Sequence, residues 1–459
     1  MKAIRDKERV LVEGLAAIRQ QFQLPAEFAP EVEQAADKAA DRFAEDRIDR
    51  TDLDFVTLDP LSSVDLDQAF ALEADGADIL LHYAIADIGA YVVDGDPIDL
   101  AAWERGETIY LPDGKIPLYP KTLSEGLASL LPNADKAALL HRVRVAPDGK
   151  AVLEQTERAT VRSRAKLGYA TVSDADLPAI FADFAARIDA AEAARGAVSI
   201  EPPQQEVTRD DGHYRLQFRP MSMTEQRNAA LSLAANLAIA DALLAAGTGL
   251  FRVMEPPGQW AINRLHHTAK ALGVDWPKGM TLEQVERTLD PNKPNEAAFM
   301  IALRRTGQRA TYAPFKAGKT PWHSAVEATY AHATAPLRRL ADRYVGEAAL
   351  AITNGEAVPD RITQAFARLP KVMDAADAKA AQVDSAAIEL AEATAMAGRE
   401  GQTFDGRVIA LDDRGAKIQL CDDAVVTRIA ADGLSPGERV ELKLTEASPE
   451  RRLSRFELA

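Results

Sequence analysis

Residues 55–70 read FVTLDPLSSVDLDQAF, and in this stretch an apolar run leads directly into three aspartates. Asp59 follows the β-favouring run FVTL, while Asp65 and Asp67 are two positions apart and share a face of an extended chain. The intervening loop lets both fold back towards Asp59. Carboxylates this close repel one another unless a hard divalent cation lies among their oxygens, and Mg²⁺ is the ion we expect. A solvated turn at a strand end is the alternative.

The composition is that of an ordinary folded protein. With 459 residues, of which 47% are hydrophobic and 27% charged, the chain is long enough for two or three domains. The single cysteine, Cys421, excludes an internal disulfide and suits a reducing cytoplasm, where we expect the protein to act. The first fifteen residues, MKAIRDKERVLVEGL, lack an uninterrupted apolar run, so we expect no signal peptide. The most apolar segment, residues 229–247, contains Asn236 and Asp241 and predicts a buried helix rather than a membrane span.

The net charge of −16 and the pI near 5.1 argue against indiscriminate binding of nucleic acid through a basic surface. One local segment is nevertheless cationic, with only Glu327 and Asp342 opposing it. Its members, which we call the cationic segment, are Arg304, Arg305, Arg309, Lys316, Lys319, Arg338, Arg339 and Arg343. This segment predicts either a surface for an anionic partner or a solvated helix face.

Changes of pattern divide the chain into three parts. Residues 1–50 look helical and form an appendage. Residues 51–398 form the main domain, which is β-like up to about residue 170 and helical after Arg227. Residues 399–459 predict four or five short strands, with turns at 412–415 and 433–437, and fit a small OB-like barrel. The fold class that we expect is therefore α+β.

Within the main domain we expect strands at the apolar runs 55–58, 69–72, 79–85 and 141–145, interrupted by a helix over 97–106. We expect further helices over 229–246, 259–272, 282–289, 296–305, 337–352 and from 361 to about 398.

Three ordered segments resemble the motifs of one family. TLDPLSSVDLDQAF is similar to its metal motif, and YAHATAPLRRLADR to its closing arginine motif. Between them, HYAIADIGAYVVDGDPID and ERGETIYLPDGKIPLYPKTLSEGLASLLPN are similar to its middle signature. The family is that of the RNB catalytic domain of ribonuclease II and ribonuclease R, and the resemblance covers roughly residues 53–395. It implies a mixed β-sheet surrounded by helices, followed by an OB-type RNA-binding barrel.

The resemblance implies a hydrolytic exoribonuclease that degrades single-stranded RNA from 3′ to 5′ and releases nucleoside 5′-monophosphates. Asp59, Asp65 and Asp67 would hold Mg²⁺, with Mn²⁺ as the alternative ion, and Asp67 is also expected to be catalytic. A metal ion makes the attacking water nucleophilic and neutralises phosphate charge, and carboxylates are suitable ligands for it.

Arg338 is expected to stabilise the charge that builds on the scissile phosphate, because its forked guanidinium is always ionised. Arg339 is expected to contact the same or the next phosphate. Pairing of Arg338 with Asp342, four residues on in a helix, is the alternative for these arginines.

Further residues are expected to bind RNA. Tyr110 matches a family position whose ring packs on nucleotides near the 3′ end, and a half-buried core tyrosine is the alternative. Tyr330 and His332 are expected to shape the pocket. Asp384, in a late helix, matches an acidic position of the family.

The chain departs from the family pattern at three places. Gln68 follows Asp67 where the family has a fourth carboxylate, and an amide can ligate a metal but brings no charge and cannot act as a base. Asn228 stands where an acidic pair is usual, so one nucleotide clamp is expected to differ. Two N-terminal cold-shock barrels do not fit into fifty helical residues. RNA delivery is then expected to rest on the C-terminal barrel, the cationic segment or a partner protein, although no obligate partner is indicated.

Three hypotheses follow, and an active Mg²⁺-dependent exoribonuclease leads because the motifs occur together and in order. The rival is a catalytically weak RNA-binding relative in which Gln68 has altered the metal site. The retained aspartates argue against this rival, because clustered carboxylates repel RNA. A metalloenzyme acting on small phosphate esters explains the aspartates and the low pI but not Tyr110 or the barrel.

Overall fold

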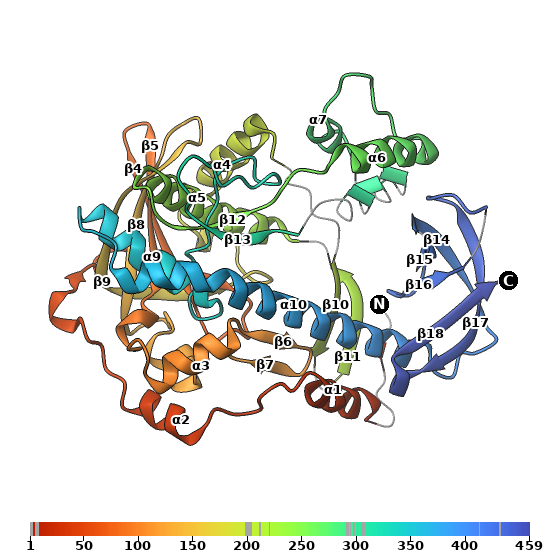
Figure 1. The fold of residues 1–459 in the computed structure, drawn as a ribbon, viewed down its shortest axis with the longest axis horizontal. Coiled ribbons are helices and arrows are strands. Elements are labelled where there is room, and N and C mark those ends of the chain that lie inside the picture. The colour runs from red at the N-terminus through yellow and green to blue at the C-terminus, as the bar shows by residue number, and fades with distance from the viewer. Residues whose placement is uncertain are drawn as a thin grey trace.

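The structure is a computed structural model (Figure 1). It describes residues 3–4, 9–197, 204–210, 213–219, 221–290, 293, 295–296, 299–300, 302–303, 309–412, 414–430 and 433–459. Half of the expected helix over 296–305 falls on other residues, as do Arg304 and Arg305 of the cationic segment, so this part of the expectations lies outside the described residues.

A six-stranded mixed sheet forms the centre of the main domain, in the order β2-β9-β3-β4-β5-β8. The strands are β2 (Ile48–Asp49), β3 (Phe55–Asp59), β4 (Gln68–Asp75), β5 (Asp78–Ala86), β8 (Asp135–Val145) and β9 (Ala151–Gly168). The first part of β9 pairs antiparallel with β8 and its last part pairs parallel with β3, so the sheet closes on itself. The expected mixed sheet is confirmed.

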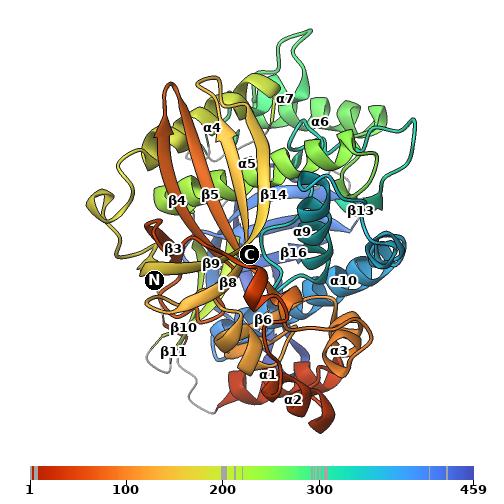
Figure 2. The same cartoon turned by 90° about the vertical axis from the view of Figure 1, so that its left-hand side faces the viewer.

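Helices surround this sheet (Figure 2). α5 (Met223–Ala245) packs on β5, β8 and β9, α4 (Phe181–Arg195) packs on α5, and α9 (Leu340–Thr353) packs on β9. Among the described residues, α5 alone is long and apolar enough to cross a membrane, and half of its most apolar stretch is buried inside the protein. Leu231, Ile239 and Leu243 of α5 are fully buried, so the prediction of a buried core helix is confirmed.

The N-terminal segment is helical as expected, in α1 (Val10–Gln21) and α2 (Pro30–Asp37), but it is not an appendage. Leu11, Leu15 and Ile18 of α1 are buried in the same apolar cluster as part of α10 (Asp360–Met396). The first strand, β1 (Ala3–Ile4), pairs with β11, and β2 joins the main sheet. The segment is therefore part of the main body.

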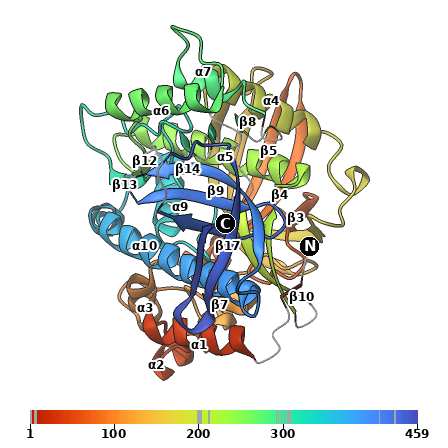
Figure 3. The ribbon, with the colours of Figure 1, turned by 90° about the vertical axis from the view of Figure 1, so that its right-hand side faces the viewer.

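The C-terminal barrel consists of five strands in the order β16-β15-β14-β17-β18 (Figure 3). They are β14 (Thr403–Asp412), β15 (Gly415–Leu420), β16 (Val426–Ile429), β17 (Arg439–Ser448) and β18 (Leu453–Leu458). The two outer strands β16 and β18 also contact one another, so the barrel is nearly closed, and its core continues into α10 and α1. The expected OB-like barrel is confirmed.

The remaining elements connect these parts. They are α3 (Pro97–Arg105), β6 (Ile109–Leu111), β7 (Gly114–Ile116), β10 (Gln204–Asp210), β11 (His213–Arg219), β12 (Leu250–Val253), α6 (Gln259–Leu272), α7 (Leu282–Glu286) and β13 (Thr311–Pro314). The 3-10 and π turns are residues 44–46, 88–90, 123–127, 174–176 and 449–451. Two hairpins, β6–β7 and β10–β11, lie beside α10 (Figure 1).

The buried His141 makes the stability of the fold depend on pH. Its ring on β8 is fully buried, with Nδ1 2.9 Å from the hydroxyl of Thr156, and burial lowers the pKa of His141 to about 4. Between pH 6.5 and 4 the unfolded chain binds a proton that the folded chain excludes, so stability falls as pH falls. From pH 7 to pH 5 we expect the wild type to lose about 2 kcal/mol more than His141→Asn in urea unfolding. Equal losses in both proteins would contradict this assignment.

Candidate active site

The aspartates of the first motif lie at one end of the main sheet. Asp59 is the last residue of β3 and Asp67 directly precedes β4, its antiparallel neighbour. The loop between them is fixed, because Leu66 N–H donates to the Ser129 hydroxyl at 2.9 Å, which in turn donates to Val64 O at 2.7 Å. The strand pairing therefore brings Asp59 and Asp67 to the same end of the sheet.

Asp67 joins the first motif to the arginine motif. Its side chain is only 9% exposed, and Oδ1 accepts a hydrogen bond of 2.7 Å from Leu337 N–H. Oδ2 lies 3.7 Å from Nε of Arg338, whose side chain is 43% exposed. The two residues expected to be catalytic are thus brought together, with a cationic group at the surface above a buried carboxylate.

The neighbouring arginine behaves differently. Arg339 is engaged by Asp342, with its Nη2 2.8 Å from Oδ2 and its Nε 3.1 Å from Oδ1. The alternative, in which Arg338 pairs with Asp342, is wrong, because α9 begins at Leu340 rather than at residue 337. Arg339 has extended backbone angles (φ −134°, ψ 121°) and forms a β-bridge with Glu107. Arg338 is consequently left free of Asp342, and the RNA contact of Arg339 stays a prediction.

Asp67, which is buried, and Asp59, which is partly buried, face too little positive charge at this end of the sheet. Burial raises the pKa of Asp67 to about 8 and that of Asp59 to about 7, and the opposing charge of Arg338 only partly offsets it. Asp65 adds negative charge near both. Its own carboxylate lies 2.7 Å from Nζ of Lys115, which also pairs with Glu125 at 3.1 Å.

The donor set suits a hard divalent cation, since oxygen ligands and uncompensated carboxylate charge are what such an ion requires. Asp59 and Asp67 would hold it. Within the described part of the chain, however, no three His, Cys, Asp or Glu side chains converge as a preformed metal cluster, and Asp65 is turned to Lys115. The role of Asp65 as a ligand stays a prediction.

Both the nitrogen and the oxygen of the Gln68 amide make hydrogen bonds. Its Nε2 donates to Thr334 O at 2.7 Å, and its Oε1 accepts from the Tyr83 hydroxyl at 2.5 Å. This amide therefore ties β4 to the segment that precedes Arg338. Ligation of a metal by Gln68 also stays a prediction, and would require its oxygen to share or leave the Tyr83 bond.

The first residues of the arginine motif form an aromatic layer with Tyr312. The Tyr330 and His332 rings are 5.4 Å apart, and His332 Nδ1 is 2.9 Å from the Tyr312 hydroxyl. Arg252 covers Tyr312 at 4.5 Å and pairs with Asp377 of α10 at 3.0 Å. Tyr330 and His332 thus have packing partners here, and their contact with RNA remains a prediction.

Asn236 of α5 holds this layer in place, and sequence reasoning missed that role. Its Oδ1 accepts from Ala333 N–H at 2.9 Å, while Nδ2 lies 3.3 Å from the Tyr330 hydroxyl and 3.4 Å from the Thr334 hydroxyl. A buried asparagine within an apolar helix was the available signal, because such an amide needs partners. Lys115 gave no comparable signal, since lysines in hairpins are usually solvated.

Asn236→Ala should destabilise the protein, because it leaves the buried Ala333 N–H without its acceptor. We expect a loss of about 2 kcal/mol in the free energy of unfolding, measured with urea. Ser232→Ala on the same helix is the matched control, since within the described part of the chain that hydroxyl bonds only to Ala229 O of its own helix. An effect no larger than that of the control would show that Asn236 does not hold this segment.

Tyr110 is attached to the arginine motif through the backbone. Thr108 N–H donates to Arg338 O and Leu340 N–H donates to Gly106 O, each at 2.9 Å. Two residues further on, 53% of Tyr110 is exposed. Burial of its hydroxyl and the nearby charge of Asp65 raise the pKa of Tyr110. The ring is therefore an exposed surface beside the carboxylates, not a half-buried core residue.

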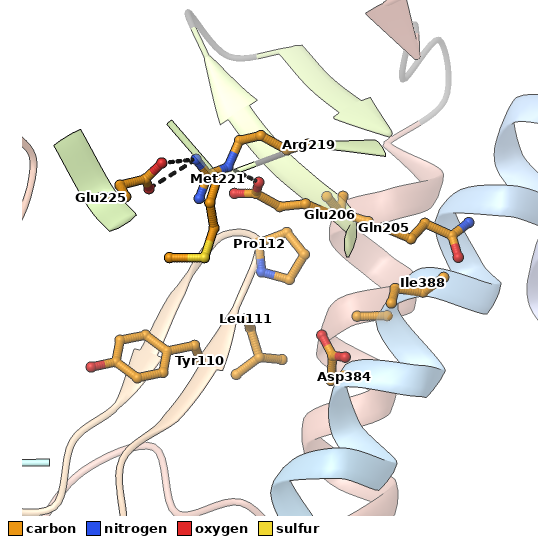
Figure 4. A pocket seen from close by; sticks show the side chains of 12 residues that line it. Tyr110, Leu111, Pro112, Gln205, Glu206, Arg219, Met221, Glu225, Asp384 and Ile388 are labelled. Atoms are coloured by element: carbon orange, nitrogen blue, oxygen red, sulfur yellow. Dashed lines mark hydrogen bonds and ion pairs between the residues drawn. The ribbon is translucent and has the colours of Figure 1, made fainter. Parts of the chain in front are cut away.

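Asp384 lies apart from this centre, on the far side of the Tyr110 hairpin. It lines a pocket of about 590 Å³ together with Tyr110 (Figure 4). The structure thus brings Asp67 and Arg338 into one site, places Asp59, Asp65 and Tyr110 beside it, and leaves Asp384 in a neighbouring cavity.

Comparisons with known proteins agree with this arrangement. The RNB domain family matches residues 47–352, and the RNase II-type exonuclease C-terminal S1 domain family matches residues 402–459. The chain is 43% identical to Exoribonuclease 2 of Photorhabdus laumondii over 131 residues, which are 28% of this chain and 20% of that protein. It is 26% identical to Ribonuclease R of Aquifex aeolicus, over 93% of this chain and 64% of the relative.

Among solved structures, RNase R of Mycoplasma genitalium in complex with ribose-methylated single-stranded RNA has a similar fold. The TM-score is 0.88 with 22% sequence identity, over all of this chain and 79% of the other. The chain thus spans less than two thirds of the length of the curated relatives named above.

Proposed function

Because the chain belongs to the RNB-domain family of ribonuclease II and ribonuclease R, we propose that it is an exoribonuclease acting on single-stranded RNA. It hydrolyses the strand from its 3′ end, depends on Mg²⁺, and releases nucleoside 5′-monophosphates. The observation that carries the proposal is the contact between buried Asp67 and exposed Arg338, beside the free ring of Tyr110. This combination suits a phosphodiester with a base attached.

The residues divide the work as follows. A bound divalent cation lowers the pKa of a water molecule and neutralises charge on the phosphate, and Asp59 and Asp67 would hold it. Leu337 N–H fixes one oxygen of Asp67, so the carboxylate is already oriented before substrate arrives. Arg338 presents its guanidinium where charge grows on the scissile phosphate. Tyr110 stacks on a base, which any nucleotide sequence permits.

A second candidate is the catalytically weak RNA-binding relative, and the geometry of Gln68 is the observation that favours it. A neutral amide committed to Tyr83 and Thr334 cannot supply the charge of a fourth carboxylate. The site then has less charge with which to hold a second metal ion.

Chelation of metal ions should separate the two candidates. A 5′-labelled single-stranded RNA of about thirty nucleotides is incubated with Mg²⁺, with Mn²⁺ and with EDTA, and the products are resolved on a sequencing gel. We expect a ladder that shortens from the 3′ end with Mg²⁺, no products with EDTA, and no cleavage of the matched DNA. RNA that stays intact with both metals but shifts on a native gel would overturn the enzymatic proposal in favour of the binder.

A further inference from the structure

The pocket beside Tyr110 is built by three elements that are distant in the sequence. The β6–β7 hairpin supplies one wall, the β10–β11 hairpin with the start of α5 a second, and α10 a third (Figure 4). Gln205 fixes the second wall, since its Nε2 donates to Glu392 of α10 at 2.6 Å and to Ala424 O of the barrel at 2.8 Å. Its volume of about 590 Å³ is in the range of small-molecule sites.

Half of the twelve residues that line the pocket are apolar, and they stand beside the ring of Tyr110. Leu111 ends the Tyr110 strand and Pro112 follows it in the turn, Met221 lines the pocket from just before α5, and Ile388 extends from α10 (Figure 4). Apolar walls next to an exposed aromatic ring suit a flat ring system, because stacking removes both faces from water. The shape and polarity therefore fit a nucleobase.

The charges of the pocket disfavour a phosphate. Its one arginine, Arg219, is held by two carboxylates, with Nε 2.7 Å from Glu206 and Nη1 2.9 Å from Glu225. Asp384 points into the space from α10 and, among the described residues, has no hydrogen-bond or ion-pair partner (Figure 4). A phosphate entering here would meet this carboxylate without a free cation to offset it.

Asp384 is exposed to solvent, so its carboxylate can exchange water for the hydrogen-bond donors of a ligand that enters the pocket. A carboxylate offers only acceptors, in two adjacent oxygens. Guanine presents two adjacent N–H groups on its Watson–Crick edge, whereas the single N–H of uracil lies between two carbonyl oxygens that the carboxylate repels.

We propose that this pocket takes one nucleobase of the RNA strand, next to the base on Tyr110, and that Asp384 makes it selective for guanine over uracil. The inference rests on the proposed function, because it assumes that RNA passes Tyr110. It adds a base preference at one position to a protein that otherwise grips RNA through stacking and phosphate contacts.

Binding measured without cleavage tests the inference. The probes are fluorescent twelve-nucleotide oligouridylates that carry a single guanosine at each of the last six positions in turn, with EDTA present and fluorescence anisotropy as readout. We expect one register to bind about ten-fold more tightly than oligouridylate, the gain of a charge-assisted hydrogen bond.

Asp384→Asn should abolish that gain while leaving the affinity for oligouridylate unchanged or higher, because an amide offers one acceptor and one donor. Glu389→Gln is the matched control, since this substitution removes the same charge from an exposed residue of α10 outside the pocket. The Glu389→Gln variant should keep the preferred register. Circular dichroism melting checks that both variants fold.

Two kinds of result would contradict the inference. A wild type that binds oligouridylate with no preferred register, or a preference that survives in Asp384→Asn, overturns the inference and leaves the proposed function intact. A folded wild type that binds none of the oligonucleotides overturns both together.

Discussion

Replacing Asp67 by asparagine is expected to lower kcat by about 10³-fold or more while RNA affinity stays the same or rises. The amide can still accept the hydrogen bond from Leu337 N–H, so the local backbone keeps its partner. The amide brings no negative charge to a cation or a water molecule, so the activation of the attacking water is lost. The same loss of charge lessens repulsion of the phosphates, and this accounts for the unchanged or tighter binding.

Single-turnover cleavage and anisotropy on one labelled RNA measure both quantities. Asp54→Asn is the matched control, since that side chain is 90% exposed and precedes the same strand. The control should retain full activity. If Asp67→Asn loses RNA binding together with activity and melts at a lower temperature, Asp67 has a folding role rather than a catalytic one.

The second large effect is expected for Arg338→Ala, with kcat reduced by about 10² to 10³-fold and KM changed little. A contact that strengthens as charge develops on the phosphate stabilises the transition state more than the bound substrate. Arg338→Lys should recover part of the loss, because lysine restores the charge without the forked geometry.

Arg142→Ala provides the comparison, since its side chain is similarly exposed, at 39%, and pairs with Glu154 on the sheet. This variant should behave as the wild type. A rise of KM alone in Arg338→Ala would make Arg338 a simple phosphate anchor and would remove it from the catalytic step.

The sequence pattern was sufficient to predict helices and strands where burial requires a continuous or periodic run of apolar residues. The strands β3, β4, β5 and β8 carry continuous apolar runs, and α6 was predicted with its observed bounds, Gln259–Leu272. Strand β9 was missed because only one of its faces is buried over much of its length, so charged residues such as Glu154 and Arg158 alternate along it. Helix α4 and the β10–β11 hairpin were not predicted either.

The start of α9 shows why local pattern fails near the site. The sequence around Pro336 favours a helix, yet Arg338 O accepts from Thr108 N–H and Leu340 N–H donates to Gly106 O, so the chain here pairs with residues 106–108. That partner lies more than two hundred residues away, so spacing along the chain could not indicate it. Spacing along the chain could not indicate the ion pair of Lys115 with Asp65 or the hydrogen bond of Gln68 to Thr334 O either. These contacts determine how the side chains around the aspartates are arranged.

The continuous helix α10 has a geometric consequence. Its 37 residues span about 55 Å, with Asp377 paired to Arg252, Asp384 in the pocket and Glu392 bonded to Val426 of the barrel. One residue inserted between Asp384 and Glu392 would turn the barrel by about 100° about the helix axis and displace it by about 1.5 Å. Insertions of about seven or eleven residues, close to two or three full turns, would nearly restore the angular phase. The register of this helix therefore sets the orientation of the barrel relative to Asp67 and Arg338.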